Sequence, residues 1–178
     1  MGGRAMFKNI LCPIDGSEHA NKALSLAVDL AKKYDARLLL LHVLLRNVDT
    51  RDLRRFAENE GLTKTVASEI ERLKTVDSRV EIVRLRDLQP IASGTLVDIG
   101  EHVLAMAKLE TENGGVHDVN ATVLDGDPAD RILEHAERES VDCIVIGSRG
   151  LSDVKGLLLG SVSHKVSNRA SCTCITVK

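Results

Sequence analysis

The chain has 178 residues, 43% of them apolar, and a formal charge of −2 at neutral pH. This length and apolar content suit one domain with a buried core, and the interspersed charges exclude a general nucleic-acid or membrane surface. The longest apolar run is far shorter than the roughly 18 residues of a membrane helix. We therefore expect a single domain over residues 1–178 that binds neither nucleic acid nor a membrane.

The chain alternates between apolar runs typical of strands and helical patterns. Strands are expected over residues 9–14, 37–45, 119–124, 142–146 and 172–177, and helices over residues 18–34, 95–109, 128–138 and 161–169. The third helix has the clearest start, because Asp127 can cap it and Pro128 fits its first position. The strands are mostly continuous rather than alternating in apolar character, which favours a parallel sheet covered on both faces.

This order predicts an α/β fold with a single doubly wound, mainly parallel sheet of five strands, ordered 3-2-1-4-5, with helices on both faces, as in Rossmann-like folds. Ligands of such sheets bind beyond the carboxyl ends of the strands, here near Asp15 and Gly147. A long, charged insert, residues 46–93, follows the second strand. We expect a helical excursion there, either a lid over the site or a surface for a partner.

Glycines and a serine after the fourth strand give the strongest functional signal. Gly147, Gly150, Gly160 and Ser161 are spaced Gly-x2-Gly-x9-Gly-Ser. Glycine lets a backbone approach a ligand closely, and a helix beginning at Ser161 would present unpaired N–H groups to an anion. The spacing fits neither a P-loop nor a dinucleotide fingerprint, and it predicts a phosphate site unless these glycines only serve turns.

Other candidate residues lie near the same strand ends. Asp15 either caps the following helix, as Ser17 also could, or accepts hydrogen bonds from a ligand. Val43 ends the second strand, where its backbone N–H and C=O could contact the edge of a base. Ser161 and Ser163 offer hydroxyls, and Arg149 could offset phosphate charge.

The four cysteines lie in apolar runs, where free cysteine behaves as a small hydrophobe. Cys172 and Cys174 could form a metal or redox pair, but the companion residues of such motifs are missing, which favours a core role. We therefore expect free thiols and a cytoplasmic location. The six histidines form no metal or nucleophile constellation, and His42 is expected to pack in the sheet.

Together, residues 10–18, 41–43, 126–128, 146–150 and 160–163 resemble the universal stress protein family, specifically its ATP-binding members. The resemblance covers residues 7–43 and 94–178. It implies that Asp15 and the Val43 backbone hold adenine, that Gly126 lies near the ribose, and that the glycine motif contacts ribose and phosphates. The implied nucleotide-binding set is Pro13, Asp15, Val43, Gly126, Gly147, Arg149, Gly150, Gly160, Ser161, Val162 and Ser163.

The resemblance implies a cytoplasmic stress-response switch or sensor that binds ATP, or ADP or AMP. Mg²⁺ could bridge the phosphates, as it does with nucleotides generally. The resemblance also implies a homodimer through the last strand, residues 172–177, and a protein partner of unknown identity. The sequence offers no convincing set of groups for phosphoryl transfer, so hydrolysis should be slow or absent. The alternative is a dimeric scaffold that works without nucleotide through the insert 46–93.

Overall fold

The computed structural model describes residues 6–44, 93–151 and 159–178. The insert expected over residues 46–93 lies outside the described residues except for Ser93, which begins a helix. Its expected roles, as a lid or as a partner surface, therefore stay predictions from sequence.

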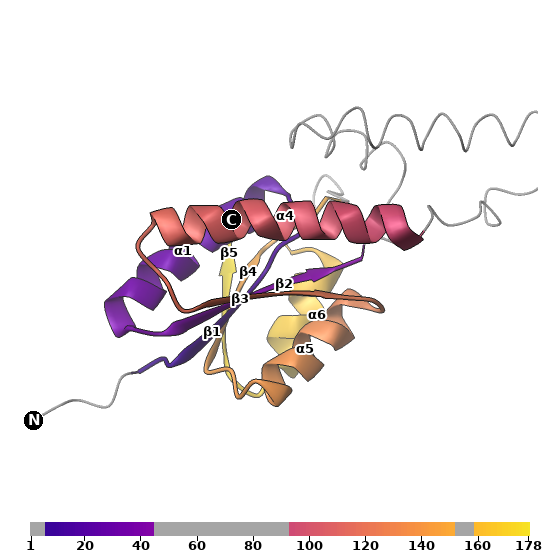
Figure 1. The fold of residues 1–178 in the computed structure, drawn as a ribbon. Coiled ribbons are helices and arrows are strands. Elements are labelled where there is room, and N and C mark those ends of the chain that lie inside the picture. The colour runs from indigo at the N-terminus through magenta and orange to yellow at the C-terminus, as the bar shows by residue number, and fades with distance from the viewer. Residues whose placement is uncertain (1–5, 45–92, 152–158) are drawn as a thin grey trace, which may run out of the picture.

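Strands and helices alternate along the described chain (Figure 1). They are β1 (Asn9–Pro13), α1 (Glu18–Tyr34), β2 (Arg37–Val43), α4 (Ser93–Asn113), β3 (Val119–Leu124), α5 (Pro128–Arg138), β4 (Cys143–Gly147), α6 (Ser161–Arg169) and β5 (Thr173–Val177). The five strands form one sheet in the order β3-β2-β1-β4-β5, and every neighbouring pair is parallel. The predicted fold class and strand order are confirmed.

Helix α4 is longer than the sequence predicted, since it runs from Ser93 to Asn113 rather than over residues 95–109. Its last turn holds because Thr111 is fully buried and its hydroxyl donates to the Ala107 carbonyl at 2.8 Å. The helix stops at Gly114 and Gly115, and Gly115 has φ +89°, which glycine adopts without strain.

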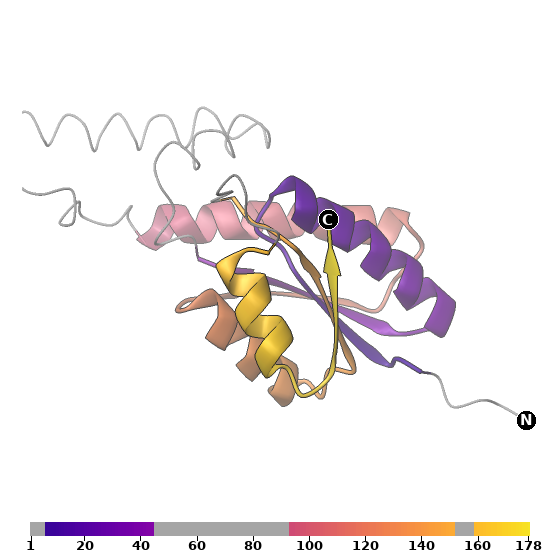
Figure 2. The same cartoon turned by 180° about the vertical axis from the view of Figure 1, so that it is seen from behind.

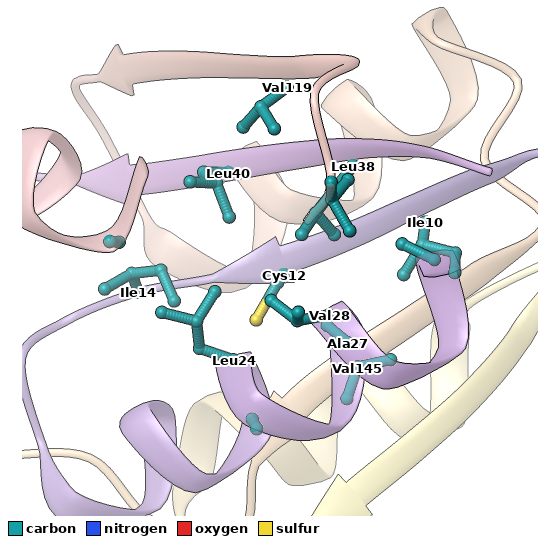
Figure 3. Packing of buried hydrophobic residues seen from close by; sticks show 14 of the residues in the cluster. Ile10, Cys12, Ile14, Leu24, Ala27, Val28, Leu38, Leu40, Val119 and Val145 are labelled. Atoms are coloured by element: carbon teal, nitrogen blue, oxygen red, sulfur yellow. The ribbon is translucent and has the colours of Figure 1, made fainter. Parts of the chain in front are cut away.

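Helices α1 and α4 cover one face of the sheet, and α5 and α6 cover the other (Figures 1 and 2). Each face of the sheet has its own hydrophobic core, and alternate residues of β2 point into one or the other. Leu38 and Leu40 pack toward α1 and α4, whereas Leu39 and Leu41 pack toward α5 and α6. Figure 3 shows the first core, where side chains from the strands meet those of α1. Among the described helices, none is both long and apolar enough to cross a bilayer.

Asp127 caps α5 as the sequence predicted. Its side chain accepts a hydrogen bond from the Asp130 N–H at 3.1 Å, and Pro128 occupies the first turn. This hydrogen bond, and more weakly the Lys165 ammonium, lowers the pKa of the Asp127 carboxyl below its usual value. The carboxylate therefore stabilises the folded chain in its charged form.

We expect Asp127→Ala to lower the free energy of unfolding by about 1 kcal/mol at pH 7, because the N–H groups of the first turn lose their acceptor. Since the folded pKa lies below the unfolded one, the charged carboxylate contributes fully above about pH 5, and its contribution disappears as pH falls through the folded pKa. Urea unfolding between pH 2 and 7 measures both effects. Asp127→Asn is the control, because asparagine also caps well, and equal stability of all three proteins at pH 7 would contradict the prediction.

Candidate functional site

A cavity of about 340 Å³ opens at the carboxyl ends of the strands, where β1 and β4 are paired. The helix that follows β1 covers one face of the sheet and the helix that follows β4 covers the other. This divergence is the switch point at which doubly wound sheets bind ligands, and the volume lies in the range of small-molecule sites. We call it the switch-point cavity.

The residues that the sequence assigned to a ligand all line this cavity. They are Pro13, Asp15, Val43, Gly126, Gly147, Arg149, Gly150, Gly160, Ser161, Val162 and Ser163. Further described residues that the sequence analysis did not assign also line the cavity: Ile14, Ala20, Leu41, Leu44, Asp127, Pro128, Ile132, Ile146, Leu151 and Lys165. Lys165 lies one helical turn after Ser161, a spacing that could have pointed to it.

Asp15 joins the turn after β1 to the loop after β4. Its Oδ1 accepts a hydrogen bond from the Ser17 N–H at 3.0 Å, and its Oδ2 accepts one from the Leu151 N–H at 3.3 Å. Ser17, rather than Asp15, caps α1, because its Oγ accepts from the Ala20 N–H at 3.2 Å. Each carboxylate oxygen has room for a second donor, so Asp15 can hold both segments and still bind a ligand.

Gly147 lies where the end of β4 touches the start of α1. A Cβ at this position would stand 2.8 Å from the carbonyl carbon of His19 and 2.9 Å from the nitrogen of Ala20. Because both are backbone atoms, a side chain here would force the strand and the helix apart. Gly147 therefore has a packing role in addition to its place on the cavity wall.

Gly150 faces the carboxylate of Asp15, and a Cβ at Gly150 would collide with Oδ2. The hydrogen bond from the Leu151 N–H to this oxygen thus depends on the missing side chain at the preceding residue. Gly147 and Gly150 are needed to assemble the cavity, whatever the cavity binds.

The N-terminus of α6 forms another part of the wall. Its N-cap, Gly160, offers no side-chain acceptor, and the Gly160 N–H donates to the Ser148 carbonyl at 2.7 Å. The N–H groups of residues 161–163 have no acceptor within the helix, and the helix dipole adds positive potential at this end. This arrangement suits an anion such as a phosphate group.

The two serines of this turn differ in their surroundings. Ser163 is 3% exposed, and its hydroxyl donates to the Ser148 carbonyl at 2.7 Å, which fastens α6 to the loop after β4. Ser161 is exposed, so its hydroxyl is the more accessible one.

Among the described residues, two cations border the cavity. Arg149 has its Nη2 3.3 Å from Nε2 of His19, and Lys165 has its Nζ 3.7 Å from Oδ2 of Asp127. The Lys165 pair is about half exposed, and surface pairs of this kind contribute little stability. Lys165 can therefore turn toward an anionic ligand with little loss to the fold.

The wall at the β2 side is apolar. Val43 is 8% exposed, and Leu41 of the same strand is also buried. Such a wall suits the flat face of a ring. Gly126, after β3, has φ +134°, a conformation that favours glycine, so its conformation alone explains a glycine there.

The cysteines lie apart from this cavity. Cys12 and Cys143 are buried as expected, whereas Cys172 and Cys174 are only partly buried, and all four are free. Burial is the main cause that raises the pKa of each thiol, in the case of Cys143 to about 12. Thiols of this kind are poor nucleophiles at neutral pH. In the described part of the chain, no cluster of three or more His, Cys, Asp or Glu side chains could hold a metal ion.

A second hollow, of about 660 Å³, lies between α4 and β3. Its lining includes none of the residues assigned to a ligand from the sequence, and it shares only Leu44 with the described wall of the switch-point cavity. The candidate site is therefore the smaller cavity, which combines the strand ends with a helix N-terminus.

The two ends of the glycine motif should respond differently to an added methyl group. We expect Gly147→Ala to lower the free energy of unfolding by about 1–3 kcal/mol, because the backbone of α1 must move. Gly160→Ala should change it by less than about 0.5 kcal/mol, since the nearest atom, the Ser148 carbonyl oxygen, lies at an ordinary contact distance of 3.4 Å. Urea unfolding compares the two, and equal losses would contradict this packing role.

The family model of the universal stress proteins matches residues 6–178. Universal stress protein YxiE of Bacillus subtilis is 34% identical over 173 residues, which cover 97% of this chain and 100% of that protein. Among solved structures, a universal stress protein in complex with cAMP has a TM-score of 0.63 at 20% identity and covers 97% of this chain and 98% of its own. The universal stress protein of Archaeoglobus fulgidus in complex with dAMP has a TM-score of 0.59 at 16% identity, with 97% of this chain and 99% of that one covered. The structures share the fold, the family model spans almost the whole chain, and the chain belongs to the universal stress protein family.

Proposed function

We propose that this protein binds an adenine nucleotide in the switch-point cavity, with ATP as the main ligand, and acts as a nucleotide-dependent switch or sensor in a stress response. The observation that carries the proposal is the meeting of the strand ends, the glycine-rich loop and the N-terminus of α6 around one cavity. The relatives solved with cAMP and dAMP support an adenine nucleotide as the ligand class. ADP and AMP would share the base and ribose contacts.

The base would lie at the apolar side of the cavity, between the end of β2 and Asp15. Val43 offers a backbone N–H and C=O to the edge of the base, and the carboxylate of Asp15 can accept from an amino or hydroxyl group. The ribose would lie toward Gly126. This order along the cavity leaves the phosphates toward α6.

The phosphates would meet the first turn of α6 and the loop that carries Gly147 and Gly150. The helix N-terminus supplies N–H donors, and Arg149 and Lys165 supply positive charge. Mg²⁺, when present, would be held through the phosphate oxygens, as is usual for nucleotides. Its binding should therefore depend on the nucleotide.

The arrangement of the charged groups supports little or no hydrolysis. Asp15 accepts hydrogen bonds with both oxygens, and Asp127 caps α5. Phosphoryl transfer needs a group that orients or deprotonates the attacking nucleophile, and the two carboxylates on the described part of the cavity wall already serve the fold. The four free thiols favour a reducing location such as the cytoplasm.

We further propose a homodimer in which β5 pairs with its copy. This strand is at the edge of the sheet, opposite the edge formed by β3. The N–H of Thr173 donates to the Asp142 carbonyl, and the carbonyl of Val177 accepts from Ser148, so odd-numbered residues of β5 face β4. The backbone groups of Cys174 and Thr176 therefore point outward and are available to a second strand.

Isothermal titration calorimetry of the full chain tests the nucleotide site. We expect ATP to bind the wild-type protein, and GTP to bind at least about tenfold more weakly, because guanine lacks the amino donor that adenine presents at that edge. Gly160→Ala should weaken ATP binding by about tenfold or more, since its methyl group would stand beside the N–H groups that meet the phosphates. Ser167→Ala, on the same helix outside the cavity wall, is the control and should bind ATP as the wild type does.

Three results would count against this function. Equal affinity for ATP and GTP would refute a base site at Asp15 and Val43. Failure of the wild type to bind any adenine nucleotide would favour the nucleotide-independent scaffold instead. A steady ATP turnover of about 1 per second or more would make the protein an enzyme rather than a switch.

Thr176→Pro tests the dimer, because proline removes an outward N–H without disturbing the bonds between β4 and β5. We expect the wild type to sediment as a dimer and Thr176→Pro to shift toward the monomer in analytical ultracentrifugation. Thr176→Val keeps the N–H and should remain dimeric. An unchanged dimer in the proline variant would place the interface elsewhere.

A further inference from the structure

The hydrogen bonds of β2 alternate between its two neighbouring strands. The N–H of Arg37 donates to the Lys8 carbonyl at 2.8 Å, and the Leu41 carbonyl accepts from the Ile14 N–H at 2.8 Å, so odd-numbered residues face β1. The N–H groups of Leu38 and Leu44 instead donate to the chain of β3, at Asp118 and Leu124. Val43 is odd-numbered, so its N–H and C=O face the β1 side, where the cavity lies.

A regular ladder would continue from the Ile14 N–H to a bond between the Val43 N–H and the Ile14 carbonyl. No such bond is present between these two described residues. The Ile14 carbonyl is instead 2.8 Å from Nδ1 of His42, a side chain with no exposed surface. A carbonyl can only accept, so Nδ1 carries the proton and donates it.

Two features keep the His42 ring neutral and within reach of the Ile14 carbonyl. Burial lowers the pKa of the imidazole below its usual value, which keeps the ring neutral with one donor nitrogen. The ring lies against Gly100 of α4, where a Cβ would stand 2.7 Å from its Cδ2. Gly100 thus leaves the space in which the imidazole can reach the Ile14 carbonyl.

We propose that His42 is a positioning residue of the nucleotide site. Its Nδ1–H donates to the Ile14 carbonyl in place of the Val43 N–H, which stays available to an acceptor atom of the bound base. This role rests on the function proposed above, and it explains why the Val43 N–H is available to the base. The neighbouring Val43 carbonyl faces the same way and would accept from the adenine amino group. Guanine presents an acceptor at that place, so this pair of backbone groups selects adenine.

Amide hydrogen exchange of the ligand-free wild type, followed by NMR, tests the backbone arrangement directly. We expect the Val43 amide to exchange at least about tenfold faster than that of Leu41, which is paired with Pro13 in the ladder. Addition of ATP should slow the exchange of Val43 and leave Leu41 unchanged. A Val43 amide as protected as Leu41 before ATP is added would overturn the proposal.

Variants of His42 test the link to binding. In His42→Leu the Ile14 carbonyl would pair with the Val43 N–H, so we expect Val43 to become protected and ATP affinity to fall about tenfold, with GTP affinity changed less than about twofold. His42→Asn, whose amide can donate from a similar position, should recover part of the ATP affinity. His135→Leu, another buried histidine outside the described cavity wall, controls for the loss of a buried imidazole and should keep the ATP to GTP ratio.

A parallel loss of ATP and GTP affinity in His42→Leu would indicate general damage and overturn the positioning role. Gly100→Ala is a second route to the same test if His42→Leu does not fold, since it displaces the ring without removing the donor. Failure of the wild type to bind adenine nucleotides would refute the proposed function. The exchange rates of Val43 and Leu41 in the free protein would still decide whether His42 replaces the ladder bond.

Discussion

The hydrogen bonds accepted by the Asp15 carboxylate connect two segments that are 136 residues apart in the sequence, and the cavity depends on that connection. Beyond the last pairs of the ladder, the turn after β1 and the loop after β4 no longer bond to one another as strands do. Their backbone N–H groups still need acceptors, and Asp15 supplies one to each. Gly150 must lack a side chain for this carboxylate to fit. Gly150 and Asp15 therefore depend on one another structurally.

Several groups that can act as donors or acceptors at the cavity belong to the main chain. The first turn of α6 offers N–H groups, the end of β2 offers the N–H and C=O of Val43, and the glycine loop brings its backbone close. Recognition by main-chain groups depends on the path of the chain more than on side-chain identity. The path is fixed by contacts behind the wall, such as the hydroxyl of Ser163 on the Ser148 carbonyl.

The sequence predicted the helices well where the start of the helix carries a local signal. The bounds of α1, α5 and α6 match because Ser17, the pair Asp127 and Pro128, and Gly160 mark their starts. The end of α4 was missed, since its last turn is held by the burial of Thr111, which depends on tertiary packing. Asp15 and Gly147 could be assigned because the topology brings their strand ends together, whereas Gly126 was assigned only through the resemblance to the family. The bond of His42 to Ile14 could not, because it depends on how α4 packs on the sheet.

Buried polar atoms without a partner gather beside the cavity. In the described chain they are Nε2 of His42, Nε of Arg131 and Oγ of Ser148. His42 lies between two wall residues of β2, Ser148 follows Gly147, and Arg131 packs against Gly126. Because side chains alternate between the two faces of a sheet, His42 points into the core between wall residues of β2, and a buried polar atom without a partner destabilises the fold. Unpartnered polar atoms beside a cavity are typical of a functional site, where local packing is compromised for the arrangement that a ligand needs.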